Sequence, residues 1–79
     1  MNKVTTNTPQ EELDDFEFQK ACVLDLLYQI KEVNKMISLH KEGSRDSLMV
    51  SQYEYLRSNF LTDLKEILAE FGIEITTNA

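Results

Sequence analysis

Residues 16–37, FEFQKACVLDLLYQIKEVNKMI, decide the fold of this chain because apolar residues recur along them at the spacing of a helix seam. One series recurs every seven residues and consists of Phe16, Val23, Ile30 and Ile37. The intermediate positions complete a heptad pattern and are filled by Gln19, Leu26, Val33 and His40. Such a pattern predicts a long amphipathic helix whose seam packs along a partner helix.

Helix-start signals lie just ahead of this stretch. Thr8 offers a hydroxyl at the N-cap, Pro9 suits the first helical position, and Glu11 completes a capping box. No further glycine or proline occurs before Gly43, which we expect to end the helix in the left-handed conformation. The first helix is therefore predicted to span residues 9–42.

A second apolar stripe follows after a short connection. Its members lie three or four residues apart and are Met49, Tyr53, Leu56, Phe60, Leu64, Ile67 and Phe71. Asp46 is the expected N-cap, with Ser44 and Ser47 as alternatives, and Gly72 is expected to close the helix in a Schellman motif. The second helix is predicted to span residues 47–71, antiparallel to the first because the connection is short.

These elements predict an all-α fold, an antiparallel two-helix hairpin with long, coiled-coil-like helices, as a single domain over residues 9–73. Residues 1–8 are expected to form a disordered tail and residues 74–79 a flexible one. The predicted hairpin core collects the seam residues of both helices, which are Phe16, Val23, Leu26, Ile30, Val33, Ile37, Tyr53, Leu56, Phe60, Leu64, Ile67 and Phe71.

Both helices carry more apolar residues than one partner helix can cover. The excess flanks the two seams and consists of Leu24, Tyr28, Leu61 and Leu68. A chain of 79 residues has a thin core, and an exposed apolar flank of this size is unusual in a soluble monomer. We expect these four residues to form the interface of a homodimer in which two hairpins make a four-helix bundle. The acidic start of the first helix disfavours a dimer with both starts side by side, and the orientation is otherwise open.

Residues able to perform chemistry are few. One cysteine excludes an internal disulfide, and with a single histidine it cannot supply a zinc site. Cys22 has no neighbouring cation and is expected to be a small apolar filler, whereas His40 is expected to be structural at a helix end. Carboxylate pairs at helical spacing fall on outward faces. We therefore expect no catalytic residue, no metal site and no cofactor.

Two smaller features leave alternatives open. Gln19 and Asn34 lie on or beside the first seam, where they either set the register of the hairpin and its oligomeric state or mark a wet edge. Leu48, Tyr55 and Ile73 fall on the opposite side of the second helix, where they are either scattered surface residues or a minor partner contact.

Net charge limits the partners. Fourteen acidic and eight basic residues give a formal charge of -6, which should repel nucleic-acid phosphates and anionic membranes, so we expect neither nucleic-acid nor membrane binding. The amino terminus lacks the features of a secretion signal, and no apolar run approaches the ~18 residues of a membrane span. We expect a cytoplasmic protein.

These features favour a non-enzymatic helical adaptor or regulator that binds proteins, as a homodimer and with a further protein partner. One alternative is an acidic antagonist that imitates nucleic acid and occupies the basic groove of a DNA- or RNA-binding protein. A second alternative is a small ligand-binding bundle with a pocket near His40. No motif in the sequence identifies a family.

Overall fold

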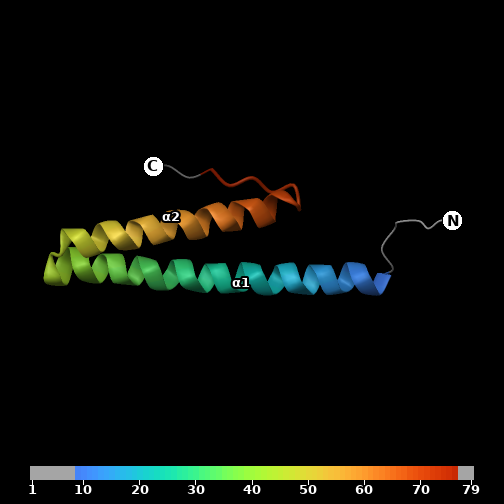
Figure 1. Ribbon diagram of the computed structural model, residues 1–79, viewed down its shortest axis with the longest axis horizontal. Coiled ribbons are helices and arrows are strands. Elements are labelled where there is room, and N and C mark those ends of the chain that lie inside the picture. The colour runs from blue at the N-terminus through green and yellow to red at the C-terminus, as the bar shows by residue number, and fades with distance from the viewer. Residues whose placement is uncertain (1–8, 77–79) are drawn as a thin grey trace.

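The computed structural model describes residues 9–76, which fold as two antiparallel helices joined by a tight turn (Figure 1). Helix α1 spans Pro9–Leu39, a π-helical turn η1 spans His40–Ser44, and α2 spans Ser47–Ala69. The predicted all-α hairpin is confirmed, and it forms a rod with principal extents of 63 × 20 × 15 Å.

Some predictions concern residues outside the described range. The predicted N-cap Thr8 and the predicted tail of residues 1–8 lie outside it, as do residues 77–79 of the predicted carboxyl-terminal tail. Within the range, the first turn of α1 contains Glu11 and Glu12, whose negative charge is favoured by the unpaired amide groups at a helix start.

The turn between the helices differs from the prediction. Gly43 lies within η1 and lacks a positive φ, so the prediction that it ends the first helix in the left-handed conformation is wrong. Arg45 takes that role, with a φ of 56°, and its backbone N–H donates to the carbonyl of His40. The N–H of Asp46 donates to the same carbonyl at 3.1 Å. In the wider π turn the N–H that donates to this carbonyl comes from a later residue than in an α turn. The left-handed residue therefore lies after the glycine.

Both ends of α2 form as predicted. The Asp46 carboxylate accepts a hydrogen bond from the backbone N–H of Met49 at 3.2 Å, which confirms Asp46 as the N-cap. At the other end Gly72 has a φ of 74°. The N–H of Ile73 donates to the carbonyl of Leu68 at 3.1 Å, the longer-range bond of a Schellman motif. Beyond Gly72 the chain reverses direction (Figure 1).

The core is thin and lies along the seam between the two helices. Its buried apolar side chains are Leu26, Val33, Ile37, Val50 and Leu64. Further residues of the predicted core are only half-buried, namely Val23, Ile30, Tyr53, Phe60 and Ile67. Of the half-buried residues, Tyr53 and Phe60 pack against the cluster of Val33, Ile37 and Val50 near the turn.

In its first half, the seam of α2 runs one residue later than the predicted stripe. The prediction chose Met49 and Leu56, but Val50 is buried and Leu56 is 40% exposed, so Leu56 is wrong as a core residue. Arg57 occupies the seam position seven residues after Val50 and seven before Leu64, and it is half-buried. Because a charged residue stands in the middle of that heptad series, the hydrophobic pattern favoured its apolar neighbour.

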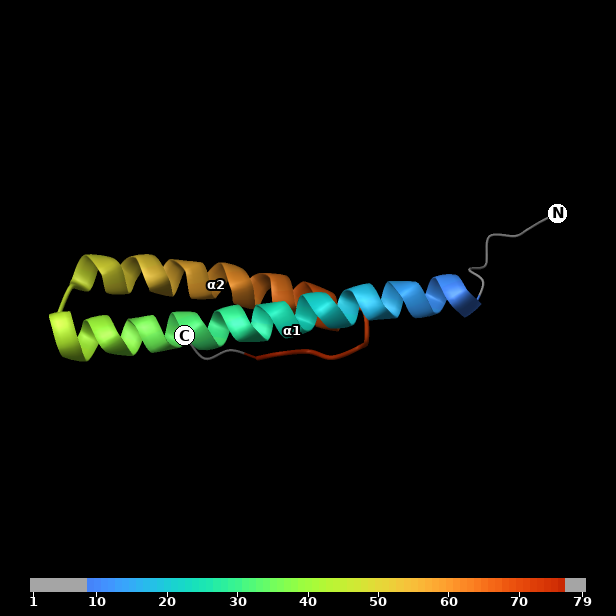
Figure 2. The same cartoon turned by 90° about the horizontal axis from the view of Figure 1, so that it is seen from below.

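The predicted core also fails at the open end of the hairpin, where Phe16 and Phe71 are 46% and 44% exposed. Helix α2 ends here, whereas α1 continues past it (Figures 1 and 2). The two rings contact each other edge to face, with centroids 6.2 Å apart and an interplanar angle of 78°. Residues 9–15 of α1 therefore extend beyond the last level at which the helices meet.

The two glycines should respond differently to alanine. We expect Gly72→Ala to lower the free energy of unfolding by about 1 kcal/mol, because a side chain is strained at positive φ. Gly43→Ala should be neutral or slightly stabilising, because an added Cβ would meet only Leu39 Cδ1, at 3.9 Å, and alanine has less freedom in the unfolded chain. Urea unfolding followed by circular dichroism measures both. A larger loss for Gly43→Ala would contradict this account of the turn.

Candidate interaction surface

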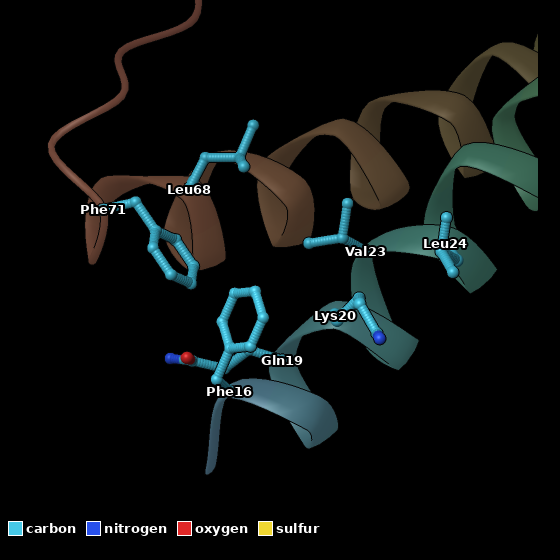
Figure 3. Close-up of a pocket in the computed structure, with 7 residues that line it drawn as sticks. All are labelled: Phe16, Gln19, Lys20, Val23, Leu24, Leu68 and Phe71. Carbon is cyan, nitrogen blue, oxygen red and sulfur yellow. The ribbon is translucent and has the colours of Figure 1, made fainter. Parts of the chain in front are cut away.

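An apolar groove lies at the open end of the hairpin (Figure 3). Its lining residues come from α1 and from the end of α2 and are Phe16, Gln19, Lys20, Val23, Leu24, Leu68 and Phe71. The walls are almost wholly apolar, and Figure 3 shows the rings of Phe16 and Phe71 next to each other at one end. The groove has a volume of about 230 Å³. Small-molecule pockets begin at roughly 300 Å³, so this hollow better suits one or two apolar side chains of another protein.

We call a set of exposed or half-buried apolar residues in and near the groove the apolar face. It consists of Phe16, Leu24, Leu27, Tyr28, Leu61, Leu68 and Phe71. Leu24 and Tyr28 are 60% and 59% exposed, whereas Leu61 and Leu68 are half-buried. Leu24 and Leu68 line the same groove. By helical spacing, Leu61 lies on the same side of α2 as Leu68, and Tyr28 lies one turn from Leu24 toward the outer edge of α1.

Of the four residues predicted to form a dimer interface, Leu24 and Leu68 line one groove. Leu61 lies on the same side of α2 as Leu68, whereas Tyr28 lies toward the outer edge of α1. Whether the four form an interface stays a prediction. The rest of the chain leaves Leu24 and Tyr28 uncovered. Lysines accompany the apolar residues there: Lys20 lines the groove, and Lys31 and Lys65 fall on the same side by helical spacing. Lysine stems can lie along an apolar partner while their ammonium groups stay in water.

The opposite side of the hairpin is acidic. Two shallow hollows there have linings that include Asp15, Asp25, Asp63, Glu66 and Glu70. Both hollows also contain Cys22, which is half-buried. Across residues 9–76, no group of histidine, cysteine and carboxylate side chains is arranged to hold a metal ion. The two sides of the rod therefore present opposite chemistry, one apolar with lysines and one lined by carboxylates.

Hydrogen bonds cross the seam at two levels. The Gln19 side-chain amide donates to the Glu70 carboxylate at the open end, and Arg57 Nη1 donates to Asn34 Oδ1 at 2.9 Å further toward the turn. Each bond joins the two helices and is lost if one helix slides past the other by a turn. Of the two interpretations of Gln19 and Asn34, these contacts favour a role in register.

The partners Arg57 and Glu70 were missed by sequence reasoning. Arg57 had a detectable signal, because it occupies a seam position between Val50 and Leu64. A polar residue at such a position needs a partner, and Asn34 on the facing helix supplies it. Glu70 had no such signal, since it lies on the outer side of its stripe.

His40 lies at the turn, where its ring stacks on Tyr53 with centroids 5.6 Å apart and an interplanar angle of 18°. It is half-buried, and this packing fits the structural role expected from the sequence. A hollow of about 260 Å³ lies beside it, lined by His40, Lys41, Arg45, Ser47 and Val50.

The residues of the expected minor patch are widely exposed. Leu48 and Tyr55, two turns apart on the outer side of α2, are 67% and 69% exposed, and Ile73, beyond the end of the helix, is 49% exposed. They surround no hollow among those described here. Whether these residues contact a partner stays a prediction.

No family model, curated protein or solved structure matches this chain. Among residues 9–76, no helix has the length and apolar character needed to cross a membrane. Inference about function therefore starts from the surfaces described above.

A double-mutant cycle tests the contact between Asn34 and Arg57. We expect Asn34→Ala, Arg57→Ala and the double variant to show a coupling energy of about 0.5–1 kcal/mol, because the hydrogen bond is exposed but involves a charged donor. Chemical unfolding of the four proteins measures it. The pair Asn59 and Arg57 serves as control and should be additive, since Asn59 lies on the outer side of α2. Zero coupling between Asn34 and Arg57 would favour the other interpretation of Asn34, that it marks a wet edge of the seam.

Proposed function

We propose that this chain is a non-enzymatic protein–protein interaction module that acts as a dimer of hairpins, an adaptor or regulator in the cytoplasm. The apolar face is its binding surface. The observation that carries the proposal is the exposure of Leu24 and Tyr28 near an apolar groove. Contiguous exposed apolar surface that is bordered by polar residues is typical of protein interaction sites.

The dimensions of the hairpin support this proposal. The chain exposes 6109 Å² of surface, whereas a compact monomer of this mass exposes about 4,900 Å². Its radius of gyration is 17.6 Å, against about 12 Å for a compact domain of this length. A single hairpin therefore shields less of its surface than a compact domain of its size normally does. Association with a second hairpin would shield more without any change of fold.

The residues that a partner would cover also suit an interface. Phe16, Tyr28 and Phe71 are aromatic, and aromatic side chains are enriched where proteins bind one another. The groove between Phe16 and Leu24 offers a hollow into which an apolar side chain can insert. Hydrogen bonds across the seam hold both helices in register, so the two halves of the face keep their relative positions.

Substitution of Leu24 by glutamate should abolish self-association. The wild type is expected to sediment as a dimer at micromolar concentration and Leu24→Glu as a monomer, because a carboxylate would be buried without a partner at the centre of the interface. Since Leu24 is 60% exposed in the hairpin, its replacement should leave the helical content unchanged. Sedimentation velocity and circular dichroism provide the two measurements.

Leu48→Glu is the matched control, because Leu48 is equally apolar and 67% exposed but lies on the outer side of α2. It should remain dimeric. A wild type that stays monomeric with full helicity would remove the dimer from the proposal, and a Leu24→Glu variant that stays dimeric would place the interface elsewhere.

A second candidate function is an acidic antagonist that imitates nucleic acid. The observation that favours it is the segregation of Asp15, Asp25, Asp63, Glu66 and Glu70 on the side opposite the apolar face. This chain should then compete with DNA for the basic groove of a duplex-binding protein. Its affinity for that protein should fall steeply between 50 and 200 mM salt, roughly as phosphate contacts do. Binding through the apolar face should change little with salt.

A further inference from the structure

Charge is unevenly distributed along the rod. The open half, residues 9–29 and 61–76, contains ten carboxylates and two lysines, whereas the loop half, residues 30–60, contains four carboxylates and five lysines or arginines. The rod is 63 Å long, and a Debye length is about 8 Å, so the two halves act on a neighbour as separate charged regions. One end of this molecule repels a copy of itself, and the other does not.

The apolar face lies in the strongly acidic half. Two hairpins can cover it face to face in two symmetric ways. In the parallel way, α1 of each copy lies over α2 of the other and both open ends point in the same direction. The two open halves, with ten carboxylates and two lysines each, then lie side by side, with Asp15, Asp25, Asp63, Glu66 and Glu70 on the sides turned away from the interface. In the antiparallel way, the two α1 helices lie over each other and run in opposite directions.

We infer that the apolar face takes a second copy of this chain in the antiparallel orientation, with the two-fold axis passing close to Leu24 and α1 packed on α1. This inference rests on the proposed dimer and adds its orientation and register. Charge complementarity carries it: the antiparallel arrangement moves the acidic open end of each copy away from its equivalent and over the basic loop half of the other.

The register follows from the distance of each residue from the axis. The two α1 helices run in opposite directions about the axis. A residue that precedes Leu24 by a given number of positions therefore lies level with the residue that follows Leu24 by the same number in the second copy, since each position rises by about 1.5 Å. Glu17 is then level with Lys31 of the second copy, and both fall on the outer edge of α1 by helical spacing. Lys20, whose ammonium pairs with Glu17 of its own helix at 2.8 Å, is level with Tyr28 of the second copy.

The same register also accounts for the extension of α1 past α2. Residues 9–15 lack a facing helix in the single hairpin, and Leu13 is 52% exposed there. In the antiparallel dimer Leu13 is level with Lys35 of the second copy, so the acidic extension lies along a stretch of α1 that contains Lys31 and Lys35. The acidic overhang then lies opposite lysines of the loop half, of which Lys35 also pairs with Glu32 of its own helix at 3.9 Å.

Cysteine cross-linking distinguishes the two orientations. In the background Cys22→Ala, Leu24→Cys should form a disulfide-linked dimer rapidly, because the axis brings the two copies of this position together. An equimolar mixture of Glu17→Cys and Lys31→Cys should give mainly the mixed dimer. In a parallel dimer neither result occurs, and a mixture of Leu27→Cys with Leu61→Cys should cross-link instead.

Charge reversal provides an independent test. Lys31→Glu should weaken dimerisation about tenfold, since an exposed ion pair occurs twice in the symmetric dimer and becomes a repulsion. Adding Glu17→Lys to that variant should restore most of the affinity. Lys41→Glu is the control, because Lys41 lies in η1, beyond the expected overlap, and its effect should be less than twofold.

The outcomes separate the two proposals. A wild type that is monomeric at all accessible concentrations overturns both the dimer and its orientation. A stable dimer that cross-links through cysteines at positions 27 and 61, and whose affinity is unchanged by Lys31→Glu, supports the interaction module and overturns the antiparallel arrangement. A dimer that cross-links through Leu24 and is rescued by Glu17→Lys supports both.

Discussion

The narrow apolar seam between α1 and α2 is the constraint on which the rest of the structure depends. Two helices can enclose only one stripe from each, and here that enclosure buries a few aliphatic side chains such as Leu26, Val33 and Leu64. Everything else that is apolar must lie on a flank or at an end. The exposed aromatic pair at the open end and the uncovered leucines of α1 are direct consequences of this geometry rather than separate features.

The polar residues in the seam are part of the same constraint. A thin apolar seam specifies register weakly, because one stripe of leucine and isoleucine resembles another shifted by a turn. Gln19 and Arg57 occupy seam positions and form hydrogen bonds to the facing helix, and His40 stacks on Tyr53 at the turn. These contacts reduce the apolar area that the seam buries, but they fix the alignment of the two helices. The residues of the apolar face on α1 and α2 therefore keep their relative positions.

Much of the fold could be predicted from the sequence, because heptad spacing, Asp46 and Gly72 are local signals with direct structural consequences. The turn could not, since both an α ending at Gly43 and a π turn ending at Arg45 satisfy the same carbonyls. The seam of α2 was misplaced at Leu56 because Arg57 interrupts the hydrophobic pattern that marks it. The exposure of Phe16 followed from where α2 stops, which no property of Phe16 itself encodes.

Of the candidate surface, the positions Leu24, Tyr28, Leu61 and Leu68 could be predicted from their place beside the seams. That Leu24 and Leu68 line one groove with Phe16 and Phe71 depends on how the hairpin ends in three dimensions, as does the acidic character of the opposite side. The unpaired extension of α1 has a dynamic consequence. An isolated stretch of two turns gains little from cooperative helix formation, so its amide hydrogens should exchange with solvent through local fraying long before the hairpin opens globally. Any molecule that binds this segment should therefore slow exchange at the amides of residues 10–15.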